Sequence, residues 1–226
     1  MDVTVTASVL GFIAGAGLFG YLLIQPTQLS PFPLYLAFLA LFHLLEHVAM
    51  GTKTMDSFLL DNGDEYLVAI CVPVVEFIIE WRVLPVFVKE WLAFLRVLGI
   101  LLAVCGQALR TWTIMHAGPR FSHYLVEPGL TPGEESASAE SKYFAGLITD
   151  GPFKYVRHPA YCGFFMWAMG LQLIMVNPVS LVLYARTLFV FFRDRVRVEE
   201  KQLIALYKQQ YVEYKHATPS GLPFIH

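Results

Sequence analysis

The residues best suited to chemistry lie just before an apolar segment in the second half of the chain. The run Arg157-His158-Pro159 follows a turn imposed by Gly151-Pro152 and stands at the expected start of a helix. Free backbone amides at a helix start attract anions, and two cationic or hydrogen-bonding side chains strengthen that attraction. The run predicts an anion-binding pocket rim at a membrane surface, but a basic anchor for lipid headgroups fits it equally well.

A second group, His43, Glu46 and His47, could bind a metal ion. These side chains are i, i+3 and i+4 neighbours, so they share one face of a helix. A metal site needs three or four ligands, and the sequence lacks further histidine pairs of the kind seen in membrane hydroxylases. We therefore predict a hydrogen-bonded buried cluster near the membrane interface, and no metal.

Glycines in the first apolar segment allow two interpretations. Gly15, Gly17 and Gly20 fit the G-x-G-x-x-G pattern of dinucleotide sites, which has meaning only between a strand and a helix. Here the pattern lies inside an uncharged apolar run. Gly11 and Gly15 also form a G-x-x-x-G step, which lets helices pack closely in lipid. We predict helix packing and reject the cofactor site.

The elements that position these groups are unusually apolar. The 226 residues are 56% hydrophobic and 15% charged, whereas soluble domains carry roughly 25% charged residues. The net charge of −2 argues against nucleic acid as a partner, because phosphate binding needs a basic surplus. The cysteines, Cys71, Cys105 and Cys162, lie in apolar runs and cannot form a disulfide framework.

The sequence predicts an all-α integral membrane protein with about six transmembrane helices, each near the 20 or so residues that a bilayer requires. The expected spans are 3–24, 31–50, 66–81, 91–115, 160–176 and 179–192. The last continues into the charged segment 193–214 as a cytosolic amphipathic helix, because apolar residues recur there at helical spacing. Glu76 and Arg186 lie inside spans, so we expect them to pair or to line a cavity.

The polar connection between the two halves predicts the topology. Residues 116–157 are rich in Gly and Pro, which indicates a solvent-side loop that is mobile around 132–141. Basic residues concentrate on the side that holds both termini, so this side is assigned to the cytosol. We predict one membrane-embedded domain, with a four-helix part (1–117), a cytosolic loop (118–158), and a helical hairpin with a tail (159–226).

Several motifs together resemble the isoprenylcysteine carboxyl methyltransferase family. The resemblance runs from about residue 35 to the end of the chain. It rests on Phe42-His43, Glu46, residues 56–60, Arg157-His158-Pro159-x-Tyr161-x-Gly163, Asn177-Pro178, residues 191–195, Glu199-Glu200, Tyr211-x-x-Tyr214-Lys215 and the closing motif 219–225. The Arg-His-Pro element is shared with wider prokaryotic and phospholipid methyltransferases, whereas the closing motif is more specific to enzymes acting on prenylated CaaX proteins.

The resemblance implies an endoplasmic reticulum enzyme that binds S-adenosylmethionine on the cytosolic side. It would methylate the C-terminal carboxylate of farnesyl- or geranylgeranyl-cysteine, with prenylated CaaX proteins and membrane lipids as partners. The family's substrate-contacting arginine falls on Arg195, the implied catalytic residue. Its cofactor contacts fall on Leu147, Ile148, Phe153, His158, Pro159, Ala160, Tyr161 and Glu199. Phe153 stands where the eukaryotic enzymes have Tyr, and Ala145 where they have His.

The implied chemistry needs no dedicated base. An α-carboxyl group has a pKa of about 3.3–3.7, so the acceptor is already an anion near pH 7. Arg195 and Glu199 are i and i+4 on a helix, and a solvent-exposed ion pair would explain them without catalysis. The alternative gives them separate roles, in which Arg195 orients the acceptor carboxylate and Glu199 holds the methyl donor.

Other classes of function remain open from the sequence. A membrane reductase using NADPH could share the late helical hairpin, although no cluster of Arg or Lys beyond the Arg-His-Pro element is available for a 2′-phosphate. A phospholipid or small-molecule membrane methyltransferase would share the same element. A lipid- or prenyl-binding protein without activity is the non-enzyme alternative.

Overall fold

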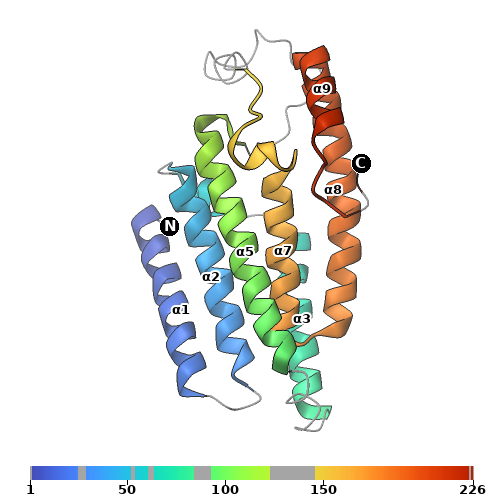
Figure 1. Cartoon of the computed structure of the whole chain (residues 1–226). Helices are drawn as coiled ribbons and strands as arrows, with labels where there is room; N and C mark the ends of the chain where they lie inside the picture. The colour runs from blue at the N-terminus through green and yellow to red at the C-terminus, as the bar shows by residue number, and fades with distance from the viewer. Residues whose placement is uncertain are drawn as a thin grey trace.

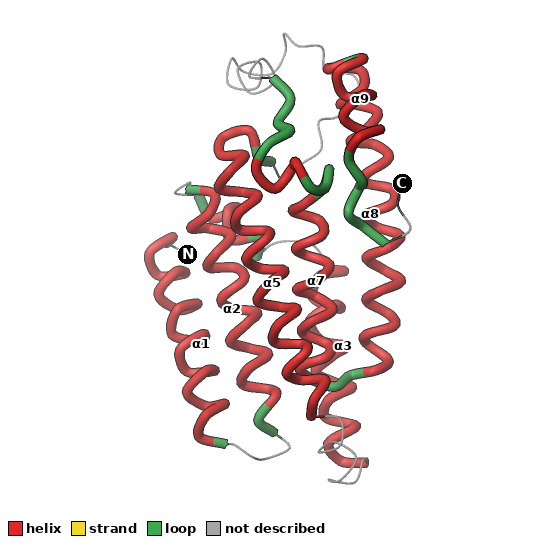
Figure 2. The backbone as a smooth tube through the Cα atoms, in the orientation of Figure 1, coloured by secondary structure: helices red, strands yellow, loops and turns green. Residues whose placement is uncertain are grey.

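The computed structural model describes residues 2–24, 29–51, 54–60, 64–83, 93–122, 146–223 and 225. In these ranges the chain is a bundle of helices that run side by side, without strands (Figures 1 and 2). The helices are α1 (Val3–Leu23), α2 (Pro31–Met50), α3 (Asp64–Val83), α5 (Ala93–Ala117), α7 (Pro159–Met175), α8 (Pro178–Tyr207) and α9 (Gln209–Ala217). The predicted mobile segment 132–141, like Ala145, lies outside the described residues.

The described helices have the character of an integral membrane protein. Three of them are long and apolar enough to cross a bilayer, namely Val3–Leu23, Pro31–Met50 and Phe94–Arg120, whereas α7 is apolar but shorter. Large apolar side chains such as Phe12, Phe94 and Val182 are exposed on the outside of the bundle. A contiguous apolar exterior of this kind is stable in lipid rather than in water.

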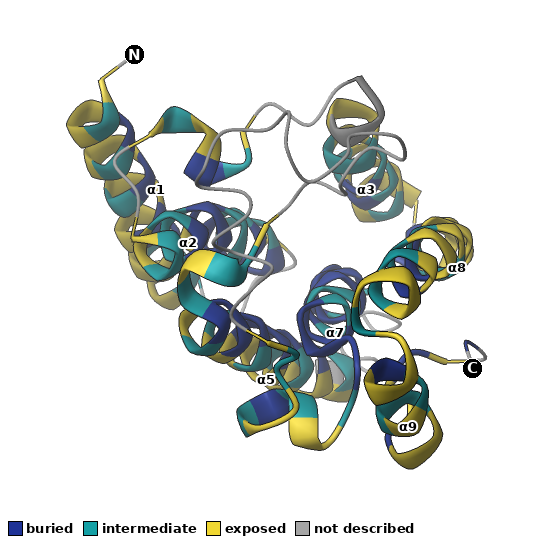
Figure 3. Cartoon of the chain, turned by 90° about the horizontal axis from the view of Figure 1, so that it is seen from above, coloured by how far each residue is buried: buried dark blue, intermediate teal, exposed yellow. Residues whose placement is uncertain are grey.

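Close packing of α5 against α7 forms the centre of the bundle, and α7 lies between α5 and α8 when viewed from above (Figure 3). A Cβ on Gly106 would lie 2.5 Å from the carbonyl oxygen of Gly163, and one on Gly99 would lie 2.7 Å from that of Gly170. Gly99 and Gly106 of α5 are seven residues apart, as are Gly163 and Gly170 of α7. Seven residues are about two helical turns, so each helix carries its two glycines on one face. The backbones therefore approach closely without side chains between them, which favours association in lipid. This glycine repeat was not among the features predicted from the sequence.

The first apolar segment is helical and packs against α2, as predicted, but through a different glycine. A Cβ on Gly17 would lie 2.5 Å from the carbonyl oxygen of Pro33 and 2.9 Å from Cβ of Ala37. Gly11 and Gly15 have no atoms within 4 Å of an added Cβ. The G-x-x-x-G step is therefore not the contact, because it lies on the open face of α1.

Polar contacts join α3 to α8. The Glu76 carboxylate accepts hydrogen bonds from two backbone amides in the first turn of α8, at 2.7 and 2.6 Å. Pro73 lacks the N–H that would bond the Ala69 carbonyl four residues earlier. The Tyr184 hydroxyl of α8 donates to that carbonyl instead. The partner expected for Glu76 is thus a helix start, where a negative charge is favoured.

Helix α8 runs without interruption from the apolar segment into the charged one. It passes Phe192 and ends at Tyr207, where Lys208 takes a positive φ of 50°. The continuous helix expected as far as Tyr214 is wrong at this point, because the chain turns at Lys208 and starts α9. Tyr211 and Tyr214 therefore lie on a separate short helix beside the end of α8.

Candidate functional site

Helix α7 begins at the end of the bundle where α8 and α9 lie (Figure 1). Seven polar side chains from these elements are linked there by hydrogen bonds. Pro159 occupies the first turn of α7, as predicted, and His158 is its N-cap residue. We call this group the rim cluster. Its members are Arg157, His158, Tyr161, Arg195, Glu199, Glu200 and Lys215.

His158 lies between two carboxylates. Its Nε2 is 3.2 Å from Oε1 of Glu200, and its Nδ1 is 3.5 Å from Oε2 of Glu199. Both ring nitrogens can donate only when the imidazole is protonated. Burial alone would lower the pKa of His158, but the two carboxylates outweigh it and raise the pKa above its ordinary value. The geometry therefore favours a buried imidazolium.

Tyr161 joins the two residues that the sequence placed at i and i+4. Its hydroxyl donates to Oε2 of Glu199 at 2.7 Å and accepts from Nε of Arg195 at 2.8 Å. The Arg195 guanidinium also lies 5.6 Å from the centre of the Tyr161 ring. The Glu199 side chain stays 31% exposed. Burial alone would raise the pKa of Glu199, but the hydrogen bonds from His158 and Tyr161 together have the larger effect and bring the pKa below its ordinary value. The carboxylate is therefore ionised, and part of it is open to solvent.

Glu200 is the most connected carboxylate of the cluster, and its role was missed from the sequence. Its side chain is 6% exposed and accepts from Nε of Arg157 at 2.8 Å and from Nζ of Lys215 at 2.5 Å. Burial opposes its ionisation, but the hydrogen bonds from His158 and Lys215 and the charge of Arg157 lower its pKa to about 2. One signal was available: Glu200 continues the buried stripe of Phe192 and Val196 at intervals of four residues.

The C-terminal segment is paired with the start of α7. The backbone N–H of Arg157 donates to the Pro219 carbonyl at 2.9 Å, and that of His158 donates to the Ser220 carbonyl at 3.2 Å. The next residue, Gly221, has a φ of +88°, and a Cβ there would lie 2.5 Å from Sγ of Cys162. The segment therefore folds tightly against α7, and only glycine fits at this turn.

The other predicted cofactor residues lie at the same end of the bundle. Leu147 and Ile148 are half-buried and lead into the turn Gly151–Lys154, where Phe153 is also half-buried. The Tyr214 hydroxyl donates to the Phe153 carbonyl at 2.6 Å, which ties the turn to α9. Pro159 and Ala160 are buried in the first turn of α7, beside His158.

His43, Glu46 and His47 were predicted to form a buried hydrogen-bonded cluster, and each of them has a hydrogen-bond partner within the protein. Glu46 accepts two hydrogen bonds from Arg110, at 2.6 and 2.9 Å. Nδ1 of His43 lies 2.8 Å from the carbonyl oxygen of Phe58, and Nδ1 of His47 lies 2.6 Å from the hydroxyl of Ser57. Within the described ranges, no three His, Cys, Asp or Glu residues are grouped to hold a metal ion.

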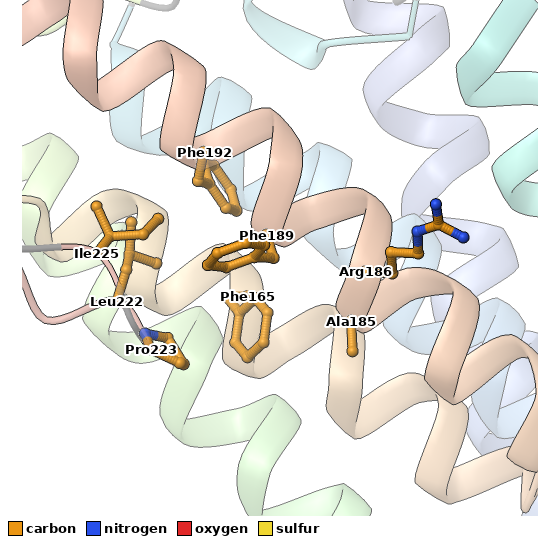
Figure 4. A pocket seen from close by; sticks show the side chains of 8 residues that line it. All are labelled: Phe165, Ala185, Arg186, Phe189, Phe192, Leu222, Pro223 and Ile225. Atoms are coloured by element: carbon orange, nitrogen blue, oxygen red, sulfur yellow. The ribbon is translucent and has the colours of Figure 1, made fainter.

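An apolar cavity of about 300 Å³ lies next to the rim cluster, between α7, α8 and the C-terminal segment (Figure 4). Its lining is Phe165, Ala185, Arg186, Phe189, Phe192, Leu222, Pro223 and Ile225. Phe192 connects the two sites, because its ring lines the cavity and lies 5.1 Å from the ring of Tyr161. Arg186 therefore lines a cavity, which is one of the two roles that the sequence predicted for it. It lies at the end of the cavity away from the C-terminal segment (Figure 4).

A charged cluster next to an apolar cavity, on a bundle of membrane helices, matches the two ends of an amphiphilic molecule. A sequence profile described as the isoprenylcysteine carboxyl methyltransferase family matches residues 97–205. The protein-S-isoprenylcysteine O-methyltransferase of Saccharomyces cerevisiae is 36% identical over 99% of this chain and 91% of its own length. The Homo sapiens enzyme of the same name is 35% identical over 99% of this chain and 75% of its own.

The fold agrees with these relatives. A solved structure of the eukaryotic intramembrane Ras methyltransferase, an isoprenylcysteine carboxyl methyltransferase, superimposes with a TM-score of 0.84 and 30% identity. The match covers 97% of this chain and 75% of that one. The chain belongs to the isoprenylcysteine carboxyl methyltransferase family.

Proposed function

We propose that this chain transfers a methyl group from S-adenosylmethionine to the C-terminal carboxylate of a prenylated cysteine. The observation that carries the proposal is the position of the apolar cavity directly below the rim cluster. Arg195 lies three residues, or about 4.5 Å of helix, beyond the cavity-lining Phe192. One molecule with a prenyl chain and a nearby carboxylate can therefore occupy both.

On the acceptor side, we assign Arg195 to the carboxylate. A planar guanidinium can bind both oxygens of a carboxylate, which fixes its direction as well as its position. Tyr161 accepts a hydrogen bond from Nε of Arg195 at 2.8 Å, which fixes the position of the guanidinium beside Phe192 and Glu199. Since the acceptor is already an anion near pH 7, alignment and exclusion of water are the tasks of the site.

The residues present fit a positively charged donor with an aromatic base. Glu199 offers an ionised, partly exposed carboxylate beside His158 and Tyr161. The half-buried apolar side chains of Leu147, Ile148 and Phe153 offer a surface for a base. Pro159 and Ala160 are buried in the first turn of α7, next in sequence to His158. S-adenosylmethionine, when bound, supplies a methyl group on a cationic sulfur that needs no further activation.

The membrane arrangement follows from the same assignment. We infer one methyltransferase unit of six spans in the endoplasmic reticulum membrane, with the rim cluster facing the cytosol. A polar donor then enters from water, while a prenyl chain, favoured in lipid by about 0.8 kcal/mol per buried CH₂, enters from the bilayer. Prenylated CaaX proteins are the proposed partners, and the apolar exterior contacts membrane lipids.

The test is methyl transfer by the purified full-length chain in detergent. With S-adenosylmethionine labelled on the methyl group, N-acetyl-S-farnesyl-cysteine should become a base-labile methyl ester. N-acetyl-S-methyl-cysteine, which keeps the carboxylate but has no prenyl chain, is the matched control and should be a poor acceptor. Labelling of phospholipid instead, or thermal stabilisation by NADPH rather than by S-adenosylhomocysteine, would contradict the proposal.

A further inference from the structure

Glu200 has no role in the assignments above, although it is bonded to more cations than any other described carboxylate of the rim cluster. It accepts from His158 and Arg157 through Oε1, and from Lys215 through Oε2. Its three partners come from the start of α7 and from α9. Arg157 in turn donates to the carbonyls of Thr218 and Lys215, at 2.5 and 3.2 Å. One buried carboxylate thus joins three segments of the chain.

We propose that Glu200 is a positioning residue, which holds His158 as an imidazolium and connects it to Lys215 on α9. The donor-binding part of this inference rests on the proposed function, since His158 is one of the residues assigned to S-adenosylmethionine. The charge state of His158 does not depend on that assignment.

The two carboxylates beside His158 differ in what they can do. Glu199 is 31% exposed and shares Oε2 with the Tyr161 hydroxyl, so a ligand can compete for it. Glu200 is 6% exposed and surrounded by protein donors. When Glu199 turns toward a bound molecule, Glu200 still holds Nε2 of His158. Buried hydrogen-bonded charges of this kind keep a neighbouring side chain in one orientation.

The charges around His158 show what the loss of Glu200 would do. Glu199, Glu200 and Tyr161 contact His158 directly. The titratable and charged groups packed around these three are Arg157, Arg195, Tyr211 and Lys215. Without Glu200, one carboxylate would remain among three cations in a site of low exposure. Burial and like charge both disfavour the protonated ring, so His158 would lose its proton at lower pH.

Two variants of similar size separate this role from a mere structural latch. Glu200→Gln removes the negative charge. It also places an amide N–H₂, which can only donate hydrogen bonds, among Arg157, His158 and Lys215, which are donors themselves. Lys215→Met breaks the contact with α9 but leaves both carboxylates beside His158. If Glu200 positions the charge of His158, the first variant lowers the titration midpoint of His158. The second leaves the midpoint unchanged or raises it, because a nearby cation is gone.

The decisive measurement is the titration of His158 by NMR in the full-length chain, labelled at histidine and held in detergent, with His158→Gln to assign its signal. We expect a wild-type midpoint above the ordinary value of about 6.5 and a decrease of about one pH unit, tenfold in proton affinity, for Glu200→Gln. Glu200→Asp should give an intermediate value and replaces Glu200→Gln if that variant does not fold. Equal midpoints in all variants, or a decrease for Lys215→Met as well, would overturn the proposal.

A second arm connects the charge to the donor. Affinity for S-adenosylhomocysteine, measured by calorimetry, should fall about tenfold in Glu200→Gln at pH 8 and recover toward pH 6, where His158 is protonated again. A purely structural role would weaken binding equally at both pH values, which would also overturn the proposal. Absence of methyl transfer by the wild type would refute the proposed function, but it would leave the titration result in force.

Discussion

Arginine and glutamate side chains are combined in two different ways at two places in the described part of the chain. In the inner pair, Glu46 and Arg110, both carboxylate oxygens are bonded and the side chains are 0% and 7% exposed. Phe42 and Phe164 cover the guanidinium at 5.5 and 5.4 Å. In the rim cluster, a tyrosine hydroxyl joins Arg195 to Glu199, and that carboxylate is 31% exposed.

The difference separates residues that hold helices together from residues that can bind a ligand. The inner pair joins α2 to α5 and, through Arg110 and the Ala160 carbonyl at 3.3 Å, to the start of α7. Its atoms are used by the protein and closed to water. At the exposed edge of the rim cluster, the Glu199 carboxylate keeps a charge that a ligand can reach. The Glu200 carboxylate, by contrast, is closed to water like the inner pair.

The largest effect is expected when one member of the inner pair is removed. Glu46→Leu leaves the Arg110 charge buried without its carboxylate, which typically costs about 3–5 kcal/mol of folding stability. Thermal unfolding in detergent should show a large loss of folded protein. Adding Arg110→Met should recover most of the stability, because a hydrophobic replacement of both partners is often neutral. Failure of the double variant to recover would mean that the contact with Ala160 matters more than the ion pair.

The next effect concerns the acceptor and leaves the fold intact. Arg195→Lys keeps a positive charge but loses the planar fork and the bond from Nε to Tyr161. Loss of a charged hydrogen bond, about 1.5–3 kcal/mol, should lower kcat/KM for N-acetyl-S-farnesyl-cysteine by about 10- to 100-fold. Binding of S-adenosylhomocysteine should stay near the wild-type value. Normal turnover would show that Arg195 makes only a salt bridge.

A smaller effect is expected for the exposed carboxylate. Glu199→Gln keeps the shape of the side chain and an acceptor for the Tyr161 hydroxyl but removes the charge offered to the donor. The KM for S-adenosylmethionine should rise about tenfold, equivalent to 1.4 kcal/mol, with little change in the KM for the prenylcysteine. An equal rise in both constants would place Glu199 between the two ligands rather than on the donor side.

The smallest effect is a pH dependence of stability. The raised pKa of His158 means that its contribution is complete below the unfolded value of about 6.5, and it is lost as pH rises through the folded pKa. The Glu200 contribution is complete above about 4.5 and is lost as pH falls toward its folded pKa of about 2. The Tm difference between wild type and His158→Gln should therefore be greatest between about pH 4.5 and 6.5. A difference that grows above pH 8 would contradict a charged His158.

Local signals made part of this structure predictable from the sequence. The start of α2 at Pro31 and of α7 at Pro159 follows from proline, which fits the first turn of a helix. The end of α2 before Gly51, with a φ of 63°, follows from glycine as the residue of the left-handed region. These rules act over a few residues, so no knowledge of the packing is required.

Contacts between distant segments were not predictable in the same way. Lys215 reaches Glu200 only because the chain turns at Lys208, and no sequence pattern marked that turn. The contact glycine of α1 was misjudged because G-x-x-x-G spacing identifies a face but not the partner that covers it. The family resemblance suggested the role that we propose for Arg195, whereas the link from Arg195 through Tyr161 to Glu199 needed three-dimensional geometry.

The pairing of the C-terminal segment with α7 also sets an order of events during synthesis. Arg157 is bonded to carbonyls at Lys215 and Thr218, which lie 58 and 61 residues later in the chain. Chains are made at about 5–20 residues per second, so several seconds separate the appearance of Arg157 from that of its partners. The earlier helices must therefore enter the membrane while the rim is still incomplete. A nascent chain halted before residue 215 should be inserted yet unable to retain S-adenosylhomocysteine, because Arg157 and Glu200 would still lack their partners on α9 and at Thr218.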